Sequence, residues 1–402
     1  MEIVNSKFNL SNIASRANLI IFLHIAALFA STISNYNWVY FSIKTFLAAS
    51  VLILVIIRKK EVNKVIQTDK FFTILLTLIS IYPLISILYS KNFEYGLIKL
   101  FHYYIGTIWS IINTFLIVRI ISIEELLKGL RDLLFLSAPL VLLIIITTPF
   151  EYGTAYKFEI NRLSHVFTGR YLSYGTMILF FFFLQNKEKI YLILFSLFFV
   201  GLITSGFRAG ILGSVILITS YTIYKFYKGE LKLNKNHLIS VFVIGVVSVI
   251  SVILFNMAVI ERLLNIIGVF NSSFETGGAI AIRFDAYRLA WEIFIENPLF
   301  GAGLGSFNYE WFGSLTGTYI KYPHNLFLEI LAELGIIGLL IFGYVIGFMV
   351  VKSLRESKEL FFIILLGLFL AQFSKDLGTN GLLFGLAGSL FKVQGTKFKS
   401  IG

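Results

Sequence analysis

Long apolar runs recur along the chain, and short charged loops separate them. An α-helix needs about 20 predominantly apolar residues to cross a bilayer, whereas a membrane β-barrel would alternate in polarity. Of 402 residues, 57% are hydrophobic and only 14% are charged, which excludes an ordinary water-soluble protein. The sequence therefore predicts an all-α integral membrane protein in which residues 1–402 form a single polytopic domain.

The apolar runs predict about twelve transmembrane helices. The first is expected to be retained, because no convincing small-residue cleavage site follows it. Two longer outer loops remain, a smaller one at residues 151–167 and a large, partly helical one at 259–323. The predicted helices lie near residues 18–34, 38–57, 71–90, 96–118, 133–150, 168–186, 190–205, 210–227, 238–258, 324–351, 360–375 and 379–391.

The distribution of basic residues predicts the orientation in the membrane. If the N-terminus is cytoplasmic, the inside loops hold 22 of the 34 lysines and arginines, which places both termini in the cytoplasm. The net charge of +12 is thus explained by lipid contact and does not indicate nucleic-acid binding. The chain has no cysteine, no His-Glu-x-x-His motif and no paired metal carboxylates, so no metal or other cofactor is predicted.

The stretch at residues 322–338 opens a hydrophobic helix with a titratable group. Asn325 can satisfy one of the unpaired N–H groups at the helix start, which places His324 where the helix leaves the membrane surface. A helix N-terminus disfavours the imidazolium form, so a neutral imidazole there can act as a general base. The alternative is a histidine that only lies at the level of the lipid headgroups.

The outer loops are richer in arginine than the inner ones, and the guanidinium fork suits two-point binding of phosphate. Arg162 lies in the first outer loop, and Arg170 opens the helix that follows it. Arg208 lies in a very short outer turn, where it and the following helix end could together hold a phosphate. The alternative for Arg208 is contact with lipid headgroups.

The helical part of the large outer loop contains two arginines with different surroundings. Arg288 has Asp285 three residues before it and Glu292 four after it, so ordinary helix-surface ion pairs explain it. Arg283 has no acidic neighbour at these spacings, which favours an anionic ligand. An apolar stripe on the same segment is expected on the membrane surface or against the helical body: Ile280, Phe284, Tyr287, Trp291 and Phe294.

Several charged residues lie inside apolar runs. Lys44, Lys99 and His102 can pair with carboxylates across the bundle. Glu333 lies about 14 Å along the helix from the histidine, too deep for chemistry there, and is expected to bond to a neighbouring helix or to re-entrant backbone. The glycine-rich residues 301–305 are expected to form a turn with no clear helix after it, and four glycines of the last long helix are expected at close-packing positions: Gly335, Gly338, Gly343 and Gly347.

Three of these pieces together resemble the O-antigen ligase and O-antigen polymerase family of membrane glycosyltransferases. They are Arg208 followed by Leu212, the stretch from Arg283 through Trp291 to residues 297–301, and His324-Asn325 followed by Gly335-x-x-Gly338. The similarity is strongest over residues 205–340. Residues 168–171 depart from the family's pattern, in which many members have an asparagine-containing segment, and this leaves the role of Arg170 open.

The resemblance implies the fold of the C-superfamily of membrane glycosyltransferases and transfer of a glycan from undecaprenyl diphosphate to an acceptor hydroxyl. The reaction would invert the anomeric carbon and need no metal, at the periplasmic face of the bacterial cytoplasmic membrane. Implied partners are the lipid-linked donor, a glycan or lipid acceptor, membrane lipids, chain-length regulators and flippases. His324 would be the catalytic base, Arg208, Arg283, Arg162 and Arg170 would bind the diphosphate, and Asn325, Arg288 and Glu333 would support them.

Four readings stay open at this point. A polymerase would add the glycan to another lipid-linked repeat, and a ligase would move it onto the lipid A core; no residue separates the two, and we favour a polymerase because acceptor-specific ligases are one branch of a family that serves many surface glycans. A flippase or other transporter would place its basic groups along a cavity at mid-membrane, whereas the candidates here gather at the outer face. A structural scaffold of the cell envelope would have no special need for His324.

The predicted orientation can be tested with reporter tags. Tags at Lys60, at Lys232 and at the C-terminus are expected in the cytoplasm, because lysine-rich loops stay inside. A tag near Ser272 is expected outside, and protease protection of tagged membranes would distinguish the two sides. A cytoplasmic signal at Ser272 would contradict the proposed location of the large loop.

Overall fold

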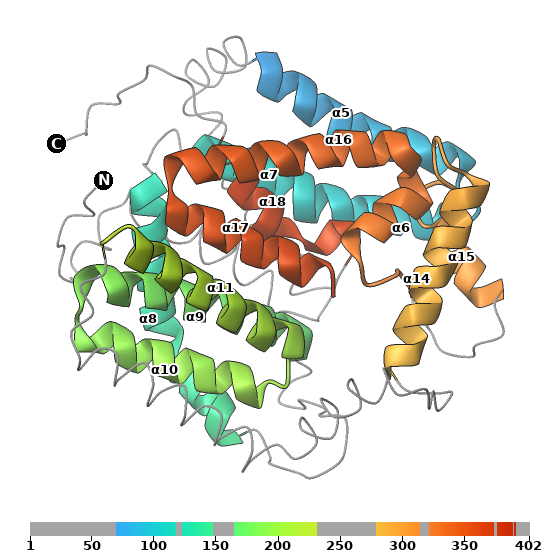
Figure 1. Ribbon diagram of the computed structural model, residues 1–402. Coiled ribbons are helices and arrows are strands. Elements are labelled where there is room, and N and C mark those ends of the chain that lie inside the picture. The colour runs from blue at the N-terminus through green and yellow to red at the C-terminus, as the bar shows by residue number, and fades with distance from the viewer. Residues whose placement is uncertain are drawn as a thin grey trace. The chain divides into compact units, whose positions relative to one another are not determined.

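A computed structural model describes residues 70–117, 123–147, 165–230, 279–313, 321–373, 376–388 and 390. Every regular element in these ranges is a helix, which confirms the all-α prediction for this part of the chain (Figure 1). Within the described ranges, three helical segments are long and apolar enough to cross a membrane, namely Lys70–Tyr89, Arg208–Tyr227 and Leu326–Glu356. The chain is thus a membrane protein, while the number of spans stays a prediction. The predicted helices near 18–34, 38–57 and 238–258 lie outside the described residues.

The chain divides into two compact units, which we describe separately. Unit 1 contains most of α8 (Ile123–Thr147), α9 (His165–Asn186), α10 (Lys189–Thr204) and α11 (Arg208–Tyr227). Helix α9 packs against both α10 and α11, and every residue from 168 to 183 is buried. Aromatic rings fill these contacts, with Phe180 against Phe195 at 5.4 Å and Phe181 against Tyr221 at 4.4 Å between ring centroids.

Helix α8 begins ten residues earlier than the predicted start at 133. Its first turns are amphipathic and rich in leucine and glutamate, so they form a helix although their hydropathy is too low for a membrane span. Arg131, which lies just before the predicted helix start at 133, is consequently a buried helical residue. Its guanidinium lies 2.7 Å from Asp132 Oδ1 and donates to the Tyr191 hydroxyl at 3.4 Å.

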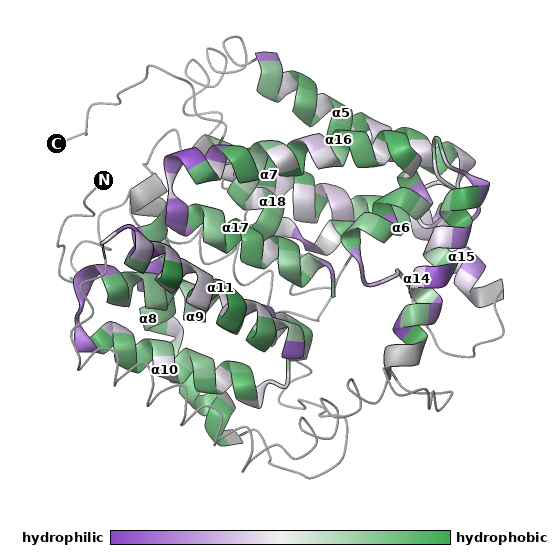
Figure 2. Cartoon of the chain, viewed as in Figure 1, coloured by the Kyte–Doolittle hydropathy of each residue, from purple (hydrophilic) through white to green (hydrophobic). Residues whose placement is uncertain are grey.

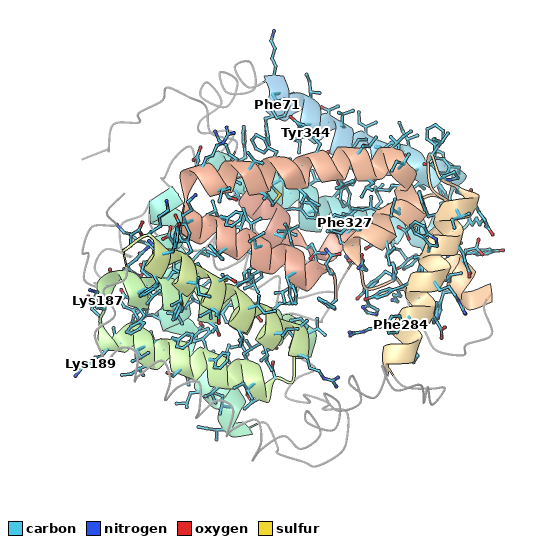
Figure 3. All side chains as sticks on the ribbon, viewed as in Figure 1. Phe71, Lys187, Lys189, Phe284, Phe327 and Tyr344 are labelled. Carbon is cyan, nitrogen blue, oxygen red and sulfur yellow. The ribbon has the colours of Figure 1, made fainter. Side chains whose placement is uncertain are left out.

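Unit 2 contains the other described elements. Residues 93–117 form one continuous helical run with a π-helical turn in its middle, close to the predicted helix 96–118. Figure 2 shows hydrophobic residues along most of α5 and α16. These helices pack together, and Figure 3 shows Phe71 of α5 beside Tyr344 of α16, with 5.7 Å between ring centroids. The elements are α5 (Lys70–Ser86), η1 (Ile87–Tyr89), α6 (Phe93–Tyr103), η2 (Tyr104–Ile108), α7 (Trp109–Ile117), α14 (Ala279–Glu296), α15 (Ser306–Gly313), α16 (Leu326–Glu356), α17 (Lys358–Ala371), η3 (Leu377–Thr379) and α18 (Gly381–Gly388).

The large outer loop is more helical than predicted. Helix α14 corresponds to the predicted helical segment, but the expectation of no helix after residues 301–305 is wrong, because α15 begins at Ser306. The Ser306 hydroxyl donates to the Ala302 carbonyl at 2.6 Å and accepts from the Lys91 N–H at 3.0 Å. This polar anchor joins the start of α15 to the turn before α6.

Helix α16 is broken at Gly335, whose φ of 66° and ψ of −165° lie in a region that is essentially restricted to glycine. The loop at residues 297–305, between α14 and α15, lies against this break. Two consecutive N–H groups of the loop donate at 2.9 Å to two carbonyls that end the first half of α16. These hydrogen bonds run from Ala302 to Ala332 and from Gly303 to Glu333.

The second half of α16 is bonded to the same loop. The N–H of Ile336 donates to the Pro298 carbonyl at 2.9 Å, and the N–H of Ile337 donates to the Leu299 carbonyl at 3.3 Å. On the other side of the break, the Tyr82 hydroxyl of α5 donates to the Leu334 carbonyl at 2.7 Å. Backbone groups that the break removes from the helix ladder are therefore bonded to the loop and to α5.

The predicted close-packing role of the α16 glycines holds for only part of the set. A Cβ atom at Gly335 would lie 2.4 Å from the Leu299 carbonyl oxygen, and one at Gly338 would lie 3.3 Å from the Tyr82 ring. At Gly343 and Gly347 a Cβ would meet no described atom within 4 Å, so the prediction is wrong there for the described surroundings. Sequence spacing alone could not separate the two pairs.

The break predicts a sharp contrast between two glycines of one helix. Gly335→Ala is expected to lower the free energy of unfolding by about 2 to 5 kcal/mol, because alanine would be strained at this φ and ψ and would collide with the loop backbone. Gly343→Ala should leave stability unchanged or slightly raised, since alanine favours helix. Thermal unfolding of both variants in detergent measures this, and equal stabilities would contradict a loop-filled break.

Candidate functional site

His324 lies two residues before the first residue of α16, which is Leu326 rather than the predicted 324. Its backbone adopts a left-handed conformation with φ of 59°, which is uncommon outside glycine although histidine tolerates it better than most residues. The Tyr322 ring meets the imidazole edge-on, with 4.6 Å between the ring centroids. The imidazole is half-buried, while Pro323 beside it is buried.

Asn325 is the N-cap of α16, as predicted. Its side-chain oxygen accepts a hydrogen bond from the Leu328 N–H at 3.0 Å, and its carbonyl accepts one from the Glu329 N–H at 2.9 Å. The cap fixes where the helix starts and therefore where the preceding histidine leaves it. His324 thus stands just outside the N-terminal, positive end of α16, as the sequence predicted.

The two arginines of α14 differ in the predicted way. Arg288 is exposed and lies 3.5 Å from Asp285 Oδ1 and 3.7 Å from Glu292 Oε1, so its expected ion pairs are confirmed. Arg283 is exposed, and no carboxylate in the described part of the chain pairs with it. Burial raises the pKa of Tyr287, one turn along α14, and the nearby charge of Arg283 opposes this rise. Of the two arginines of α14, Arg283 is therefore the one whose charge no carboxylate of the described residues neutralises.

Helix α14 packs through a different face from the predicted stripe. Alanines and an isoleucine form the buried face, and within the stripe Phe284 and Trp291 are 54% and 48% exposed. The expectation that the stripe packs against the helical body is therefore wrong for these two aromatic residues. The expected place at the membrane surface stays a prediction. The buried cluster consists of Ala286, Ala290, Ile293, Ala302, Phe307, Trp311 and Ala332.

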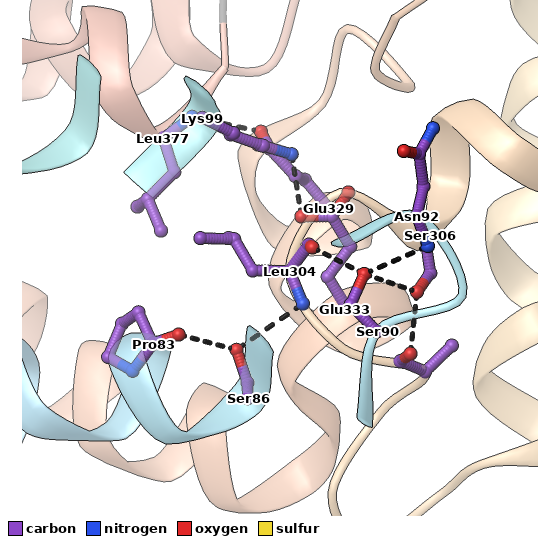
Figure 4. A network of polar contacts seen from close by, with 11 residues as sticks. Pro83, Ser86, Ser90, Asn92, Lys99, Leu304, Ser306, Glu329, Glu333 and Leu377 are labelled. Atoms are coloured by element: carbon purple, nitrogen blue, oxygen red, sulfur yellow. Dashed lines mark hydrogen bonds and ion pairs between the residues drawn. The ribbon is translucent and has the colours of Figure 1, made fainter. Parts of the chain in front are cut away.

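Lys99 of α6 lies between two glutamates of α16 (Figure 4). Its Nζ is 2.7 Å from Glu329 Oε1 and 2.6 Å from Glu333 Oε2, and all three side chains are 1% exposed. The expectation that Lys99 pairs with carboxylates is confirmed, and so is the expected bond from Glu333 to a neighbouring helix. Lys44 lies outside the described residues. We refer to these three residues as the Lys99–Glu329–Glu333 triad.

Glu329 extends the triad to a third element. Both of its carboxylate oxygens accept from the Leu377 N–H of η3, at 3.1 and 3.0 Å. The Thr107 hydroxyl donates to the Leu377 carbonyl at 2.6 Å, so η3 is held from both sides. This anchor was not predicted from the sequence, although two glutamates four residues apart inside an apolar run were a visible signal.

The remaining candidate arginines belong to unit 1 or lie outside the described residues. Arg208 is the first residue of α11. The N-cap residue is Phe207, and its side chain makes no hydrogen bond to the N–H groups of the first turn. Arg170 lies one turn inside α9 and is buried, rather than opening the helix as predicted. Arg162 lies outside the described residues. Unit 2 therefore holds Arg283, Arg288, His324, Asn325 and Glu333, and unit 1 holds Arg208 and Arg170.

Comparison with family models gives one finding that bears on these residues. Residues 192–343 match the model described as O-antigen ligase. The match begins in α10, ends within α16 and includes Arg208, Arg283 and His324. A comparison with curated proteins finds no match. The resemblance that the sequence motifs indicated is thereby confirmed.

Proposed function

From the place of residues 192–343 in the O-antigen ligase family, we propose that this membrane protein is a glycosyltransferase of the O-antigen polymerase and ligase type. Its donor is a glycan on undecaprenyl diphosphate, and its acceptor is a hydroxyl of another glycan. The family match supports membrane glycan transfer as such. The observation that supports a base at His324 is its place beside the capped N-terminus of α16.

Binding of the donor diphosphate is the proposed task of the arginines. Arg283 is exposed, has no carboxylate partner in the described residues and presents a planar fork that can bind two phosphate oxygens. Arg208 begins α11, so its guanidinium and the N–H groups of the first helical turn can bind phosphate oxygens together. Arg162 and Arg170 are further diphosphate-binding candidates, the latter from a buried position.

Proton transfer is the proposed task of His324. The acceptor hydroxyl gives its proton to a neutral imidazole nitrogen while its oxygen forms the bond to the anomeric carbon. The bond between that carbon and the diphosphate oxygen breaks, and undecaprenyl diphosphate leaves with the electron pair. The negative charge that develops on the departing diphosphate is stabilised by the arginines. One displacement inverts the anomeric carbon.

The supporting residues act on these groups from within unit 2. Asn325 fixes the start of α16 beside the histidine, Arg288 is held by its own ion pairs on α14, and Glu333 ties α16 to α6. We further propose that the site faces the periplasm, that both termini are cytoplasmic and that the protein lies in the bacterial cytoplasmic membrane. Chain-length regulators and flippases are the protein partners this activity would need.

The acceptor distinguishes a polymerase from a ligase. We propose a polymerase, in which the acceptor is another lipid-linked glycan, because the family serves many surface glycans and ligases that use lipid A are one branch of it. An assay with purified protein, lipid-linked glycan and either acceptor decides between them. Longer lipid-linked glycans are expected, and transfer only to lipid A-core would make the chain a ligase.

The two arginines of α14 provide a matched pair of variants. Arg283→Lys keeps the charge but loses two-point binding of phosphate, so glycan transfer should fall about 10-fold to 100-fold. Arg288→Lys should change transfer little, because Arg288 is occupied by Asp285 and Glu292. Rates measured with a lipid-linked donor test this, and near-wild-type transfer by both variants would exclude α14 from diphosphate binding.

Substitution of His324 tests the proposed base. His324→Ala should lower transfer by about 10²-fold to 10⁴-fold while donor binding persists, because arginines hold the donor. His324→Gln keeps a hydrogen-bonding group without basicity and should be equally impaired. In the wild-type protein the rate should fall on acidification as the imidazole becomes protonated. A His324→Gln variant with wild-type rate and pH profile would show that the imidazole only positions the acceptor or the helix.

A further inference from the structure

The Lys99–Glu329–Glu333 triad is buried, charged and absent from the proposed chemistry. Its three side chains are 1% exposed, and both ammonium–carboxylate contacts are shorter than 2.8 Å. Charged side chains buried inside a membrane protein are expensive unless they are paired, so their presence calls for a specific role. Two carboxylates share one ammonium, which means that removal of Lys99 would leave two like charges facing each other.

The triad holds the first two turns of α16. Glu329 lies in the first turn, directly after the cap at Asn325, and Glu333 lies one turn further along, just before the break at Gly335. On both sides of Gly335, backbone groups of α16 bond to the loop at residues 297–305, so the hydrogen-bond ladder that joins the segment from Leu326 to Leu334 to the long second half of α16 is interrupted. External contacts must therefore fix the direction of this short segment.

Those contacts come from three other elements of unit 2. Lys99 binds the segment to α6, the Leu377 N–H binds it to η3, and the Glu333 carbonyl binds it to the loop that follows α14 through the Gly303 N–H. The buried cluster of α14 and α15 packs on Ala332 in the same segment. The placement of His324, at one end of the segment, thus depends on the triad at its centre.

We propose that Lys99 is a positioning residue for glycan transfer, and that its ion pairs with Glu329 and Glu333 hold His324 in place relative to α14. This inference rests on the proposed function. Lys99 does not contact the reacting atoms in this scheme. It acts through the first two turns of α16, where a displacement of about 1 Å at the catalytic group can lower a rate by about 10²-fold.

Lys99→Met tests this, because methionine keeps much of the side-chain length and removes the ammonium. The kcat of glycan transfer should fall about 10²-fold with little change in the KM for the donor. Amide hydrogen exchange should become faster in peptides over residues 322–334 and stay unchanged over residues 340–356. Lys352→Met is the matched control, since Lys352 pairs with Glu356 at 3.1 Å near the other end of the same helix. Lys352→Met should change neither the kcat of glycan transfer nor the amide hydrogen exchange over residues 322–334.

A second variant covers the case in which Lys99→Met fails to fold. Lys99→Met combined with Glu329→Gln and Glu333→Gln removes all three charges of the triad together, so it should fold yet still show low kcat and fast exchange at the start of α16. Wild-type kcat or unchanged exchange over residues 322–334 in a folded triad variant would overturn the proposal. If the wild-type protein transferred no glycan, the proposed function would fail, and the exchange measurement alone would then decide whether the triad holds this segment.

Discussion

Backbone hydrogen bonding across the break in α16 is the constraint on which the rest of unit 2 depends. Inside a bilayer no water can satisfy a freed N–H or carbonyl group, and each unsatisfied group costs several kcal/mol. The loop at residues 297–305 supplies both donors and acceptors to the two halves of the helix. Such pairing requires backbones to approach without side chains between them. A Cβ atom at Gly301 would lie 2.4 Å from the backbone of Glu333 and Leu334.

This requirement explains the glycine-rich stretch at residues 301–305. Glycine at 301 and 303 lets the loop lie directly on α16 and on the end of α5, where a Cβ at Gly303 would be 2.6 Å from the Ser86 carbonyl oxygen. The loop continues directly from α14 and ends at α15, so its position fixes both helices. In consequence, the helix with Arg283 and the helix start beside His324 are joined through one short backbone junction.

Local features of the site were predictable from sequence, and long-range ones were not. The cap at Asn325 and the ion pairs of Arg288 depend on residues within four positions, so spacing alone predicts them. The break at Gly335 depends on a partner loop more than thirty residues earlier, and a Gly-x-x-Gly spacing cannot reveal it. The stripe of α14 was expected either at the membrane surface or against the helical body, and the sequence could not decide between these because hydrophobicity does not separate packing from lipid exposure. Small alanines make the buried face, while large aromatic residues lie outside.

The same reasoning separates two kinds of basic residue that look alike in an apolar sequence. Lys99 is surrounded by hydrophobic residues and is neutralised by two carboxylates from one helix face. Arg283 also lies among hydrophobic residues, but Asp285 and Glu292 of its own helix pair with Arg288. A buried cation must be matched by the fold itself, whereas an exposed guanidinium can keep its charge for a ligand. The fold therefore uses lysine to position α16, and Arg283 of α14 remains available to an anionic ligand such as a diphosphate.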